Sequence, residues 1–129
     1  MDESLGNRLV RQMKELAEVA GIKTEEYAKI SRKRLDVISL DRELDKEKSA
    51  LGGRVYELHR REGTIDFLQD VTVKACIARI QKLEESMAEV EREIQAIRGA
   101  SQERASGVRQ RYTGERNETP PEPGAGPKP

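Results

Sequence analysis

The feature that most constrains this chain is a series of apolar residues spaced seven apart. Seven residues are close to two turns of an α-helix, so the series predicts one apolar stripe along a long helix. A second series, with steps of three and four, predicts a second helix further along the chain. The first series is Ile30, Val37, Leu44, Leu51 and Leu58, preceded by Leu9, Leu16 and the polar Lys23; the second is Val73, Cys76, Ile80, Leu83, Met87, Val90, Ile94 and Ile97.

The composition fits long helices better than a large globular core. Of the 129 residues, 37% are charged and only 3% are aromatic, with no Trp and one Phe. Such a chain is typical of solvated helices that pack along narrow seams. We therefore expect an all-α fold: a long antiparallel helical hairpin (coiled coil) with a shorter N-terminal amphipathic helix and a disordered C-terminal tail.

The first expected element is an amphipathic helix over residues 1–22. Gly21 is suited to a helix C-terminus and Thr24 to the cap of a following helix, which predicts a break near Gly21. The seven-residue phase nevertheless continues to Ile30, so an unbroken helix is the alternative. We expect the apolar face to pack against a partner helix rather than a membrane, because acidic residues offset its basic ones. That face carries Leu5, Leu9, Met13, Leu16 and Ala20.

The hairpin is expected over residues 23–98, with helices at about 24–61 and 66–98. Gly63 can end the first helix, and Asp66 with Gln69 has the form of a capping box for the second. Since the apolar series keeps its phase across Gly52 and Gly53, we expect the helix to continue there. The glycines indicate either a kink or the close approach of another helix or a partner. Polar residues occupy the positions four past each member of the series, where a simple two-stranded seam would have apolar ones: Arg34, Asp41 and Lys48.

The tail is expected over residues 99–129, where the apolar periodicity stops. Residues 120–129 alternate proline with glycine and charged residues. Such a segment forms neither helix nor sheet and buries no core, so we expect 99–129 to be disordered.

The segment around Gly52 resembles a set of small, uncharacterised bacterial helical-hairpin proteins with a Leu-Gly-x-x-Val-Tyr-x-Leu motif. The resemblance covers roughly residues 23–98 and extends upstream to Lys23–Ile30. It implies a long helix, a polar glycine turn and a returning coiled-coil helix. Some members of the set carry a zinc ribbon after the hairpin; this chain has no paired cysteines, so no metal role is carried over. The motif residues here are Leu51, Gly52, Val55, Tyr56 and Leu58.

Residues with catalytic or metal-binding chemistry are few. The single histidine, His59, stands beside two arginines at an expected helix end, where we expect it to be exposed and to interact with the last carbonyls. The single cysteine, Cys76, belongs to the second apolar series and is expected to be a buried small hydrophobe. One His and one Cys cannot form a structural zinc site. We therefore expect no enzyme activity, no cofactor and no metal.

These features favour a non-catalytic coiled-coil module for protein–protein interaction or scaffolding, in the cytoplasm because no secretory signal or membrane-spanning run is present. A thin hairpin suggests self-association, most simply as a homodimer that forms a four-helix bundle, or docking on another protein. The alternative is a nucleic-acid-associated accessory protein that uses the basic run 29–34 and the arginines of the tail. The balance of 24 basic and 24 acidic residues argues against it. The interaction residues predicted are Leu51, Gly52, Gly53, Val55, Tyr56 and Leu58.

Overall fold

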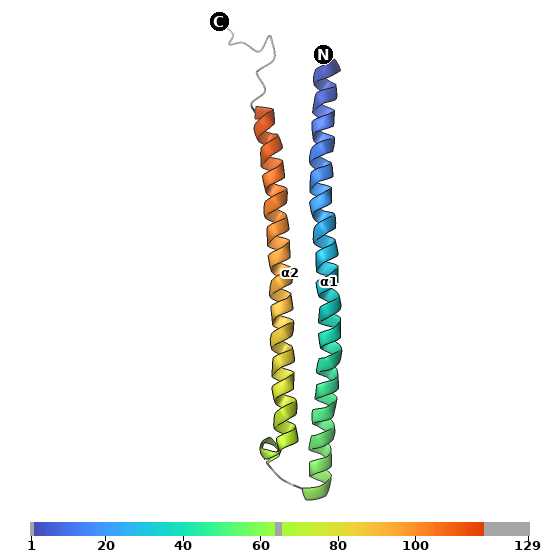
Figure 1. Ribbon diagram of the computed structural model, residues 1–129, viewed down its shortest axis with the longest axis vertical. Helices are drawn as coiled ribbons and strands as arrows, with labels where there is room; N and C mark the ends of the chain where they lie inside the picture. Colours follow the sequence, from blue (N-terminus) through green and yellow to red (C-terminus); the bar gives the residue numbers. More distant parts are fainter. Residues whose placement is uncertain (1, 64–65, 118–129) are drawn as a thin grey trace. The chain divides into compact units, whose positions relative to one another are not determined.

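The computed structural model describes the backbone of residues 2–63 and 66–117, and the side-chain surroundings of residues 4–63 and 66–114. It contains two long α-helices, α1 (Asp2–Glu62) and α2 (Val71–Asn117), with a short 3₁₀ helix, η1 (Phe67–Gln69), between them (Figure 1). The described residues include no β-strand. The expected all-α class is confirmed.

Helix α1 runs without a break through Gly21, so the expected separate helix over residues 1–22 is wrong. Thr24 does not cap a new helix. Its Oγ1 donates to the carbonyl oxygen of Ala20 at 2.9 Å, a bond that a threonine makes inside a helix, four residues back. The expected continuity across Gly52 and Gly53 is confirmed, because α1 extends through both.

Two aspartates and one glycine define the connection between the helices. Gly63 has a φ of 73°, and its N–H donates to the carbonyl oxygen of His59 at 2.9 Å, so it ends α1 as expected. Asp66, expected to cap the second helix, caps η1 through Leu68. The cap of α2 is Asp70, whose Oδ2 accepts from the N–H of Val73 at 3.0 Å, and α2 therefore begins at Val71 rather than residue 66.

Helix α2 continues well past Gly99, to Asn117. The expectation of disorder is therefore wrong for residues 99–117, while residues 118–129 lie outside the described part of the chain. Three buried residues explain the extension: Ser101, Ala105 and Tyr112 are all buried, at intervals of four and seven residues. They continue the inward stripe of α2 with two small side chains, Ser101 and Ala105, and with a tyrosine, all of which a count of strongly apolar residues passes over.

The chain divides into two compact units, one of residues 29–96 and one of residues 1–28 with 97–129. In the 29–96 unit, the buried side chains come from both helices: Leu44, Leu58, Val73, Cys76 and Ile94. Ion pairs in this unit join Lys33 to Glu93, Glu47 to Arg79 and Arg54 to Asp70, the cap of α2. The residue number of the partner therefore falls as the number in α1 rises.

The seven-residue series faces inward over only part of its length. From Ile30 to Leu58 its members are buried or half-buried, as predicted, whereas Leu9 and Leu16 are 55% and 69% exposed. A seven-residue stripe drifts by about 20° per heptad around a straight α-helix, so four heptads from Leu44 to Leu16 turn it by roughly 80°. In the unit of residues 1–28 and 97–129, the buried apolar residue of α1 is Ile22, which directly precedes Lys23 of the series.

Candidate functional site

The predicted interaction segment, residues 51–58, has an inward and an outward side. On the inward side Leu58 is 5% exposed, and Leu51 and Val55 are half-buried. On the outward side Gly52 and Gly53 are exposed, and Tyr56 is 66% exposed. The three inward residues contribute to the packing of the chain itself, so only the outward residues offer a surface to another molecule.

The two outward glycines are not explained by packing within the chain. A Cβ atom built on Gly52 or Gly53 would meet no atom within 4 Å. Nothing among the described residues therefore approaches this backbone closely. Two adjacent glycines cost roughly 1 kcal/mol each in a helix interior relative to alanine. What they provide is bare backbone next to an exposed tyrosine ring.

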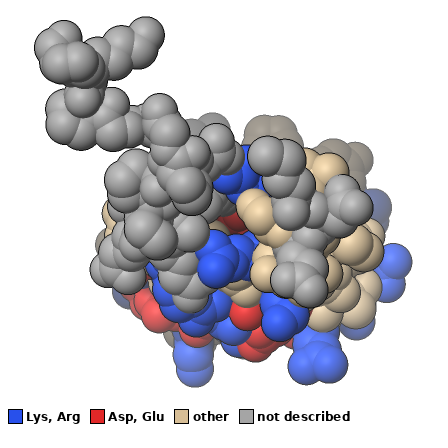
Figure 2. Space-filling model, turned by 90° about the horizontal axis from the view of Figure 1, so that it is seen from above, with Lys and Arg blue, Asp and Glu red and all other residues tan. Residues whose placement is uncertain are grey.

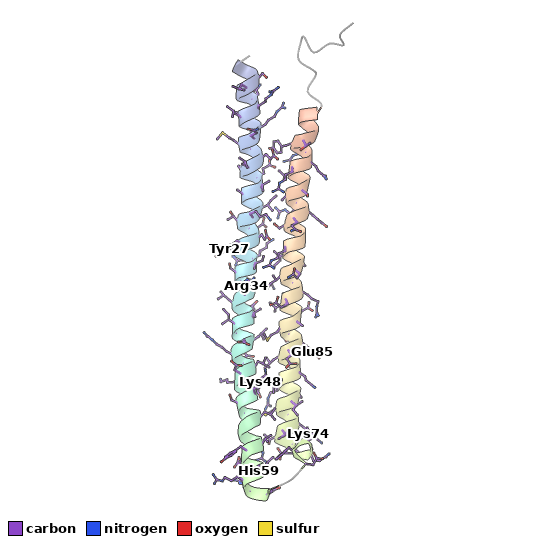
Figure 3. The ribbon with its side chains drawn as sticks, turned by 180° about the vertical axis from the view of Figure 1, so that it is seen from behind. Tyr27, Arg34, Lys48, His59, Lys74 and Glu85 are labelled. Atoms are coloured by element: carbon purple, nitrogen blue, oxygen red, sulfur yellow. The ribbon has the colours of Figure 1, made fainter. Side chains whose placement is uncertain are left out.

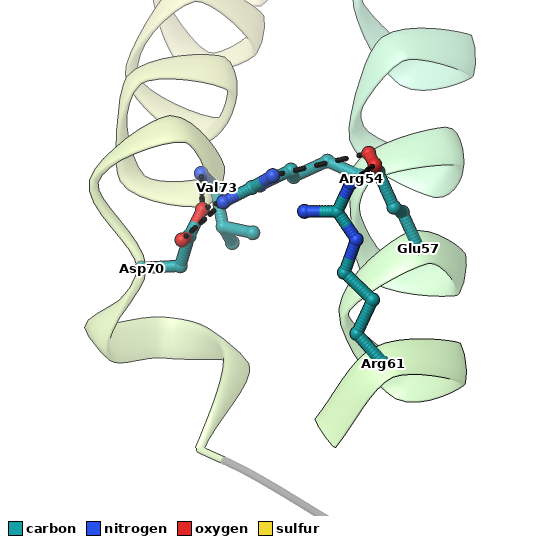
Figure 4. Close-up of polar contacts among 5 residues, drawn as sticks. All are labelled: Arg54, Glu57, Arg61, Asp70 and Val73. Carbon is teal, nitrogen blue, oxygen red and sulfur yellow. Dashed lines mark hydrogen bonds and ion pairs between the residues drawn. The ribbon is translucent and has the colours of Figure 1, made fainter. Parts of the chain in front are cut away.

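Arg54, between these glycines and Val55, makes the main polar contact of the segment (Figure 4). Its Nε and Nη2 donate to the two carboxylate oxygens of Asp70 at 3.2 and 3.0 Å. The hydrogen bond from Arg54, followed by the one from the backbone N–H of Val73, lowers the pKa of Asp70 below its usual value. Asp70 thus caps α2 and binds α1 with the same carboxylate. Glu57 forms further ion pairs with Arg54 and with Arg61, at 3.9 and 2.9 Å.

The polar positions of the seam lie three residues past Ile30, Leu44 and Leu51, not four. Lys33 pairs with Glu93 at 2.6 Å, and Glu47 pairs with Arg79 at 3.0 Å. Their neighbours in sequence, Arg34 and Lys48, are exposed (Figure 3). The seam of the 29–96 unit is therefore half apolar and half ionic, a pattern that the sequence reasoning missed. Charged residues that recur with opposite sign at this spacing, Lys33, Glu47 and Arg54, were its available signal.

In the other unit, acidic residues of α1 face polar residues of α2. Glu18 accepts a hydrogen bond from Arg111 and a second from the Tyr112 hydroxyl, the latter at 3.2 Å. Burial, with the nearby charge of Glu18, raises the pKa of Tyr112. Two turns further along α1, Glu26 accepts from the Ser101 hydroxyl at 2.8 Å, which lowers the pKa of Glu26. Contact between the helices in this unit thus combines these polar pairs with the buried Ile22, Ala105 and Tyr112.

The apolar side chains at the start of α1 remain exposed. Among the described residues, the large exposed apolar side chains are concentrated on α1; η1 has Leu68 and α2 has only Val71. Such residues are normal when scattered, but those of residues 5–16 follow one another on successive turns. On α1 the exposed set is Leu5, Leu9, Val10, Met13, Leu16, Tyr27, Leu35, Ile38 and Tyr56.

The residues with reactive side chains do not assemble into a site. His59 lies in the last turn of α1 and is exposed, as expected (Figure 3). Cys76 is buried, also as expected, with the Nη2 of Arg79 3.7 Å from its Sγ. Over the described part of the chain, no group of three or more His, Cys, Asp or Glu side chains could hold a metal ion. No described helix has the length and apolar character to cross a membrane.

Comparison with known proteins does not add a family. No family model, curated protein or solved structure matches this chain. The function must therefore be argued from the geometry, in which the exposed apolar side chains of α1 are the most prominent feature.

Proposed function

We propose that this chain is a non-catalytic interaction module: an antiparallel helical hairpin, of coiled-coil type, whose α1 helix binds another protein. The observation that carries the proposal is the asymmetry between the helices. Apolar side chains that are large and exposed are concentrated on α1 and almost absent from the described part of α2. Without a bound partner, this surface would leave a large apolar area in contact with water. Such exposure is unfavourable in proportion to the apolar area.

The hairpin is supported by the order of the contacts within each unit. In residues 29–96 the pairs are Lys33 with Glu93, then Arg54 with Asp70 close to the connection. In the other unit Glu25 pairs with Arg104 at 3.0 Å, and Glu18, further towards the N-terminus, pairs with Arg111. In both units, a step forward in α1 corresponds to a step back in α2, as antiparallel helices require.

The outward part of residues 51–58 is one contact region of the proposed surface. Tyrosine presents a large apolar ring with a polar hydroxyl group, which is why it is enriched at interfaces. At Gly52 and Gly53 a partner could approach the α1 backbone without meeting a side chain. Leu51, Val55 and Leu58 support this region from inside the hairpin.

Photo-crosslinking would test the proposal. A p-benzoyl-phenylalanine side chain is introduced at Tyr56 and, as the control, at Glu85, an exposed residue of α2 (Figure 3). In cells that naturally contain the chain, we expect a discrete crosslinked protein band from position 56 and none from position 85. Equal crosslinking from both positions would contradict the assignment to α1. Absence of any crosslink from position 56 and from further sites on α1, such as Leu16 and Leu35, would contradict an interaction function.

The nucleic-acid alternative is less well supported by the contacts. Lys33, from the basic run 29–34, pairs with Glu93, and two arginines expected in a free tail, Arg104 and Arg111, pair with Glu25 and Glu18. Basic and acidic side chains are intermixed on the face seen in Figure 2. Phosphate binding needs unneutralised positive charge, so a nucleic-acid function would require these ion pairs to open.

A further inference from the structure

The first turns of α1 carry an uncharged face that spans about half of the helix surface. In heptads placed with Leu9 and Leu16 at position d, the positions that line a helix–helix seam are a, d, e and g. Between residues 5 and 20, none of these positions is charged. Position a has Gly6, Met13 and Ala20; d has Leu9 and Leu16; e has Val10 and Ala17; g has Leu5, Gln12 and Val19. All ten are exposed except Val19, which is half-buried.

The described part of the chain does not cover this face, since nine of its ten residues are exposed. The polar contacts of α2 in the same unit include those to Glu18 and Glu25, both at position f, and to Glu26, which is at position g but beyond residue 20. Residues 118–129, outside the described part, contain no large apolar residue with which to cover it. The occupant must therefore come from another molecule.

The pattern of side-chain sizes and charges fits a second copy of the same face. In an antiparallel pair of helices, position a of one helix meets position d of the other; in a parallel pair, a meets a and d meets d. Here the a positions are mostly small and the d positions are leucine. An antiparallel copy thus sets leucines against Gly6 or Ala20, whereas a parallel copy would set small residues against each other. Because the e and g positions are uncharged, two identical copies meet without like-charge repulsion.

The apolar area is sufficient for a dimer of moderate affinity. Five large side chains of the face are at least half exposed, and each exposes on the order of 100 Å² of apolar surface. A pair of identical faces would then bury about 1,000 Å², the lower limit for a specific interface. The large residues are Leu5, Leu9, Val10, Met13 and Leu16.

We propose that residues 5–20 of α1 form a homodimer interface, in which the faces of two copies pack antiparallel with a twofold axis near the middle of the segment. This inference rests on the proposed interaction function and names its partner as a second copy. Such an interface is isologous, so every contact occurs twice.

Analytical ultracentrifugation of the full chain tests the dimer. We expect a monomer–dimer equilibrium in the micromolar range, and a dissociation constant at least tenfold weaker for the double variant Leu9→Gln, Leu16→Gln. Glutamine preserves helix propensity and approximate size. The control, Val71→Gln, removes an exposed apolar side chain of α2, which lies outside the face, and should leave the constant unchanged. A chain that is monomeric at 100 µM, or a dimer weakened equally by the control, would overturn the proposal.

Crosslinking with a short bifunctional maleimide tests the orientation. The variants carry Met13→Cys or Leu5→Cys on a Cys76→Ala background. In the antiparallel pair the two copies of position 13 are near neighbours, while the copies of position 5 are about 18 Å or more apart along the axis at 1.5 Å per residue. We expect dimers to be linked at position 13 and not at position 5. Efficient linkage at position 5 would indicate a parallel pair and refute the arrangement.

Binding to vesicles tests a lipid surface as the other occupant of this amphipathic face. Binding of the monomer to phosphatidylserine-containing vesicles, abolished by Leu9→Gln, Leu16→Gln, together with no dimer in solution, would assign the face to a lipid surface and overturn the second copy. A partner crosslinked at Tyr56 under those conditions would still uphold the proposed function. Loss of the dimer proposal and loss of the interaction function are thus separable results.

Discussion

Two leucines that occupy the same phase of the seven-residue series should differ sharply in their contribution to stability. Leu44 and Leu16 both lie in α1, four heptads apart, but Leu44 is 7% exposed and Leu16 is 69% exposed. Leu→Ala substitutions at buried sites cost about 2–5 kcal/mol in the free energy of unfolding, and the cost depends on how far the neighbours collapse. Since a seam between two helices has few layers around it, we expect about 2–3 kcal/mol for Leu44→Ala.

The same substitution at Leu16 should cost about 0.5 kcal/mol or less. Complete burial of a leucine stabilises by about 1.5–3 kcal/mol, and roughly a third of the Leu16 side chain is covered. Alanine is also a slightly better helix former than leucine, which offsets part of the loss. The expected difference between the two variants is therefore about 2 kcal/mol.

Urea denaturation followed by circular dichroism at 222 nm measures both values. It is done at about 0.1 µM, roughly tenfold below a micromolar dissociation constant, where the dimer is mostly dissociated. Ile22→Ala is the matched control in the same unit as Leu16, because Ile22 is 7% exposed; it should be destabilised like Leu44→Ala. A Leu16→Ala variant that lost as much stability as Leu44→Ala would refute the rotation of the stripe away from α2.

Two further outcomes are expected. Hydrogen bonding lowers the pKa of Asp70 in the folded chain. The ionised Asp70 carboxylate therefore stabilises the fold above its unfolded pKa of about 4, and this stabilisation is lost as the pH falls through the lower folded pKa. The melting temperature of the chain should fall over that pH range, and it should fall by less in Asp70→Asn. Tyr112→Ala should speed amide hydrogen exchange over residues 99–117, measured by mass spectrometry. Tyr112→Phe keeps the buried ring and should change the exchange little. Unchanged exchange in Tyr112→Ala would contradict the role given to that ring.

The sequence predicted the helical class and most of the inward positions, because the buried face of a helix produces apolar periodicity in the sequence. Val73, Cys76 and Ile94 from the second series are indeed buried. The limits of the helices were predicted less well. Gly21 and Thr24 have the local form of a helix boundary, yet Thr24 bonds to the carbonyl of Ala20 within the helix. Close to this point Ile22 is buried and Glu26 accepts a hydrogen bond from Ser101, and local propensity does not include such distant contacts.

The same reason explains the missed half of α2. Ser101 and Ala105 are small and only weakly apolar, so they did not register as a stripe, although both are buried. Their burial depends on close packing with α1, which no local pattern reports. At the candidate site, the seven-residue series indicated that Leu58 faces inward, but the sequence grouped Leu58 with Tyr56 and the two glycines as one contact site and did not assign Tyr56 to the outward side. That distinction depends on the phase of α1 relative to its neighbour.

The ion pair between Arg54 and Asp70 has a consequence for the order in which the chain folds. These residues are 16 apart in sequence, whereas Glu47 and Arg79 are 32 apart and Glu18 and Tyr112 are 94 apart. Closing a loop costs about 0.6 kcal/mol more for each doubling of its length, so the pair nearest the connection forms with the smallest entropic loss. Each contact then shortens the loop that the next must close. Folding should proceed like a zipper from Asp70 outward, and the contacts of Glu18 should form last and open first.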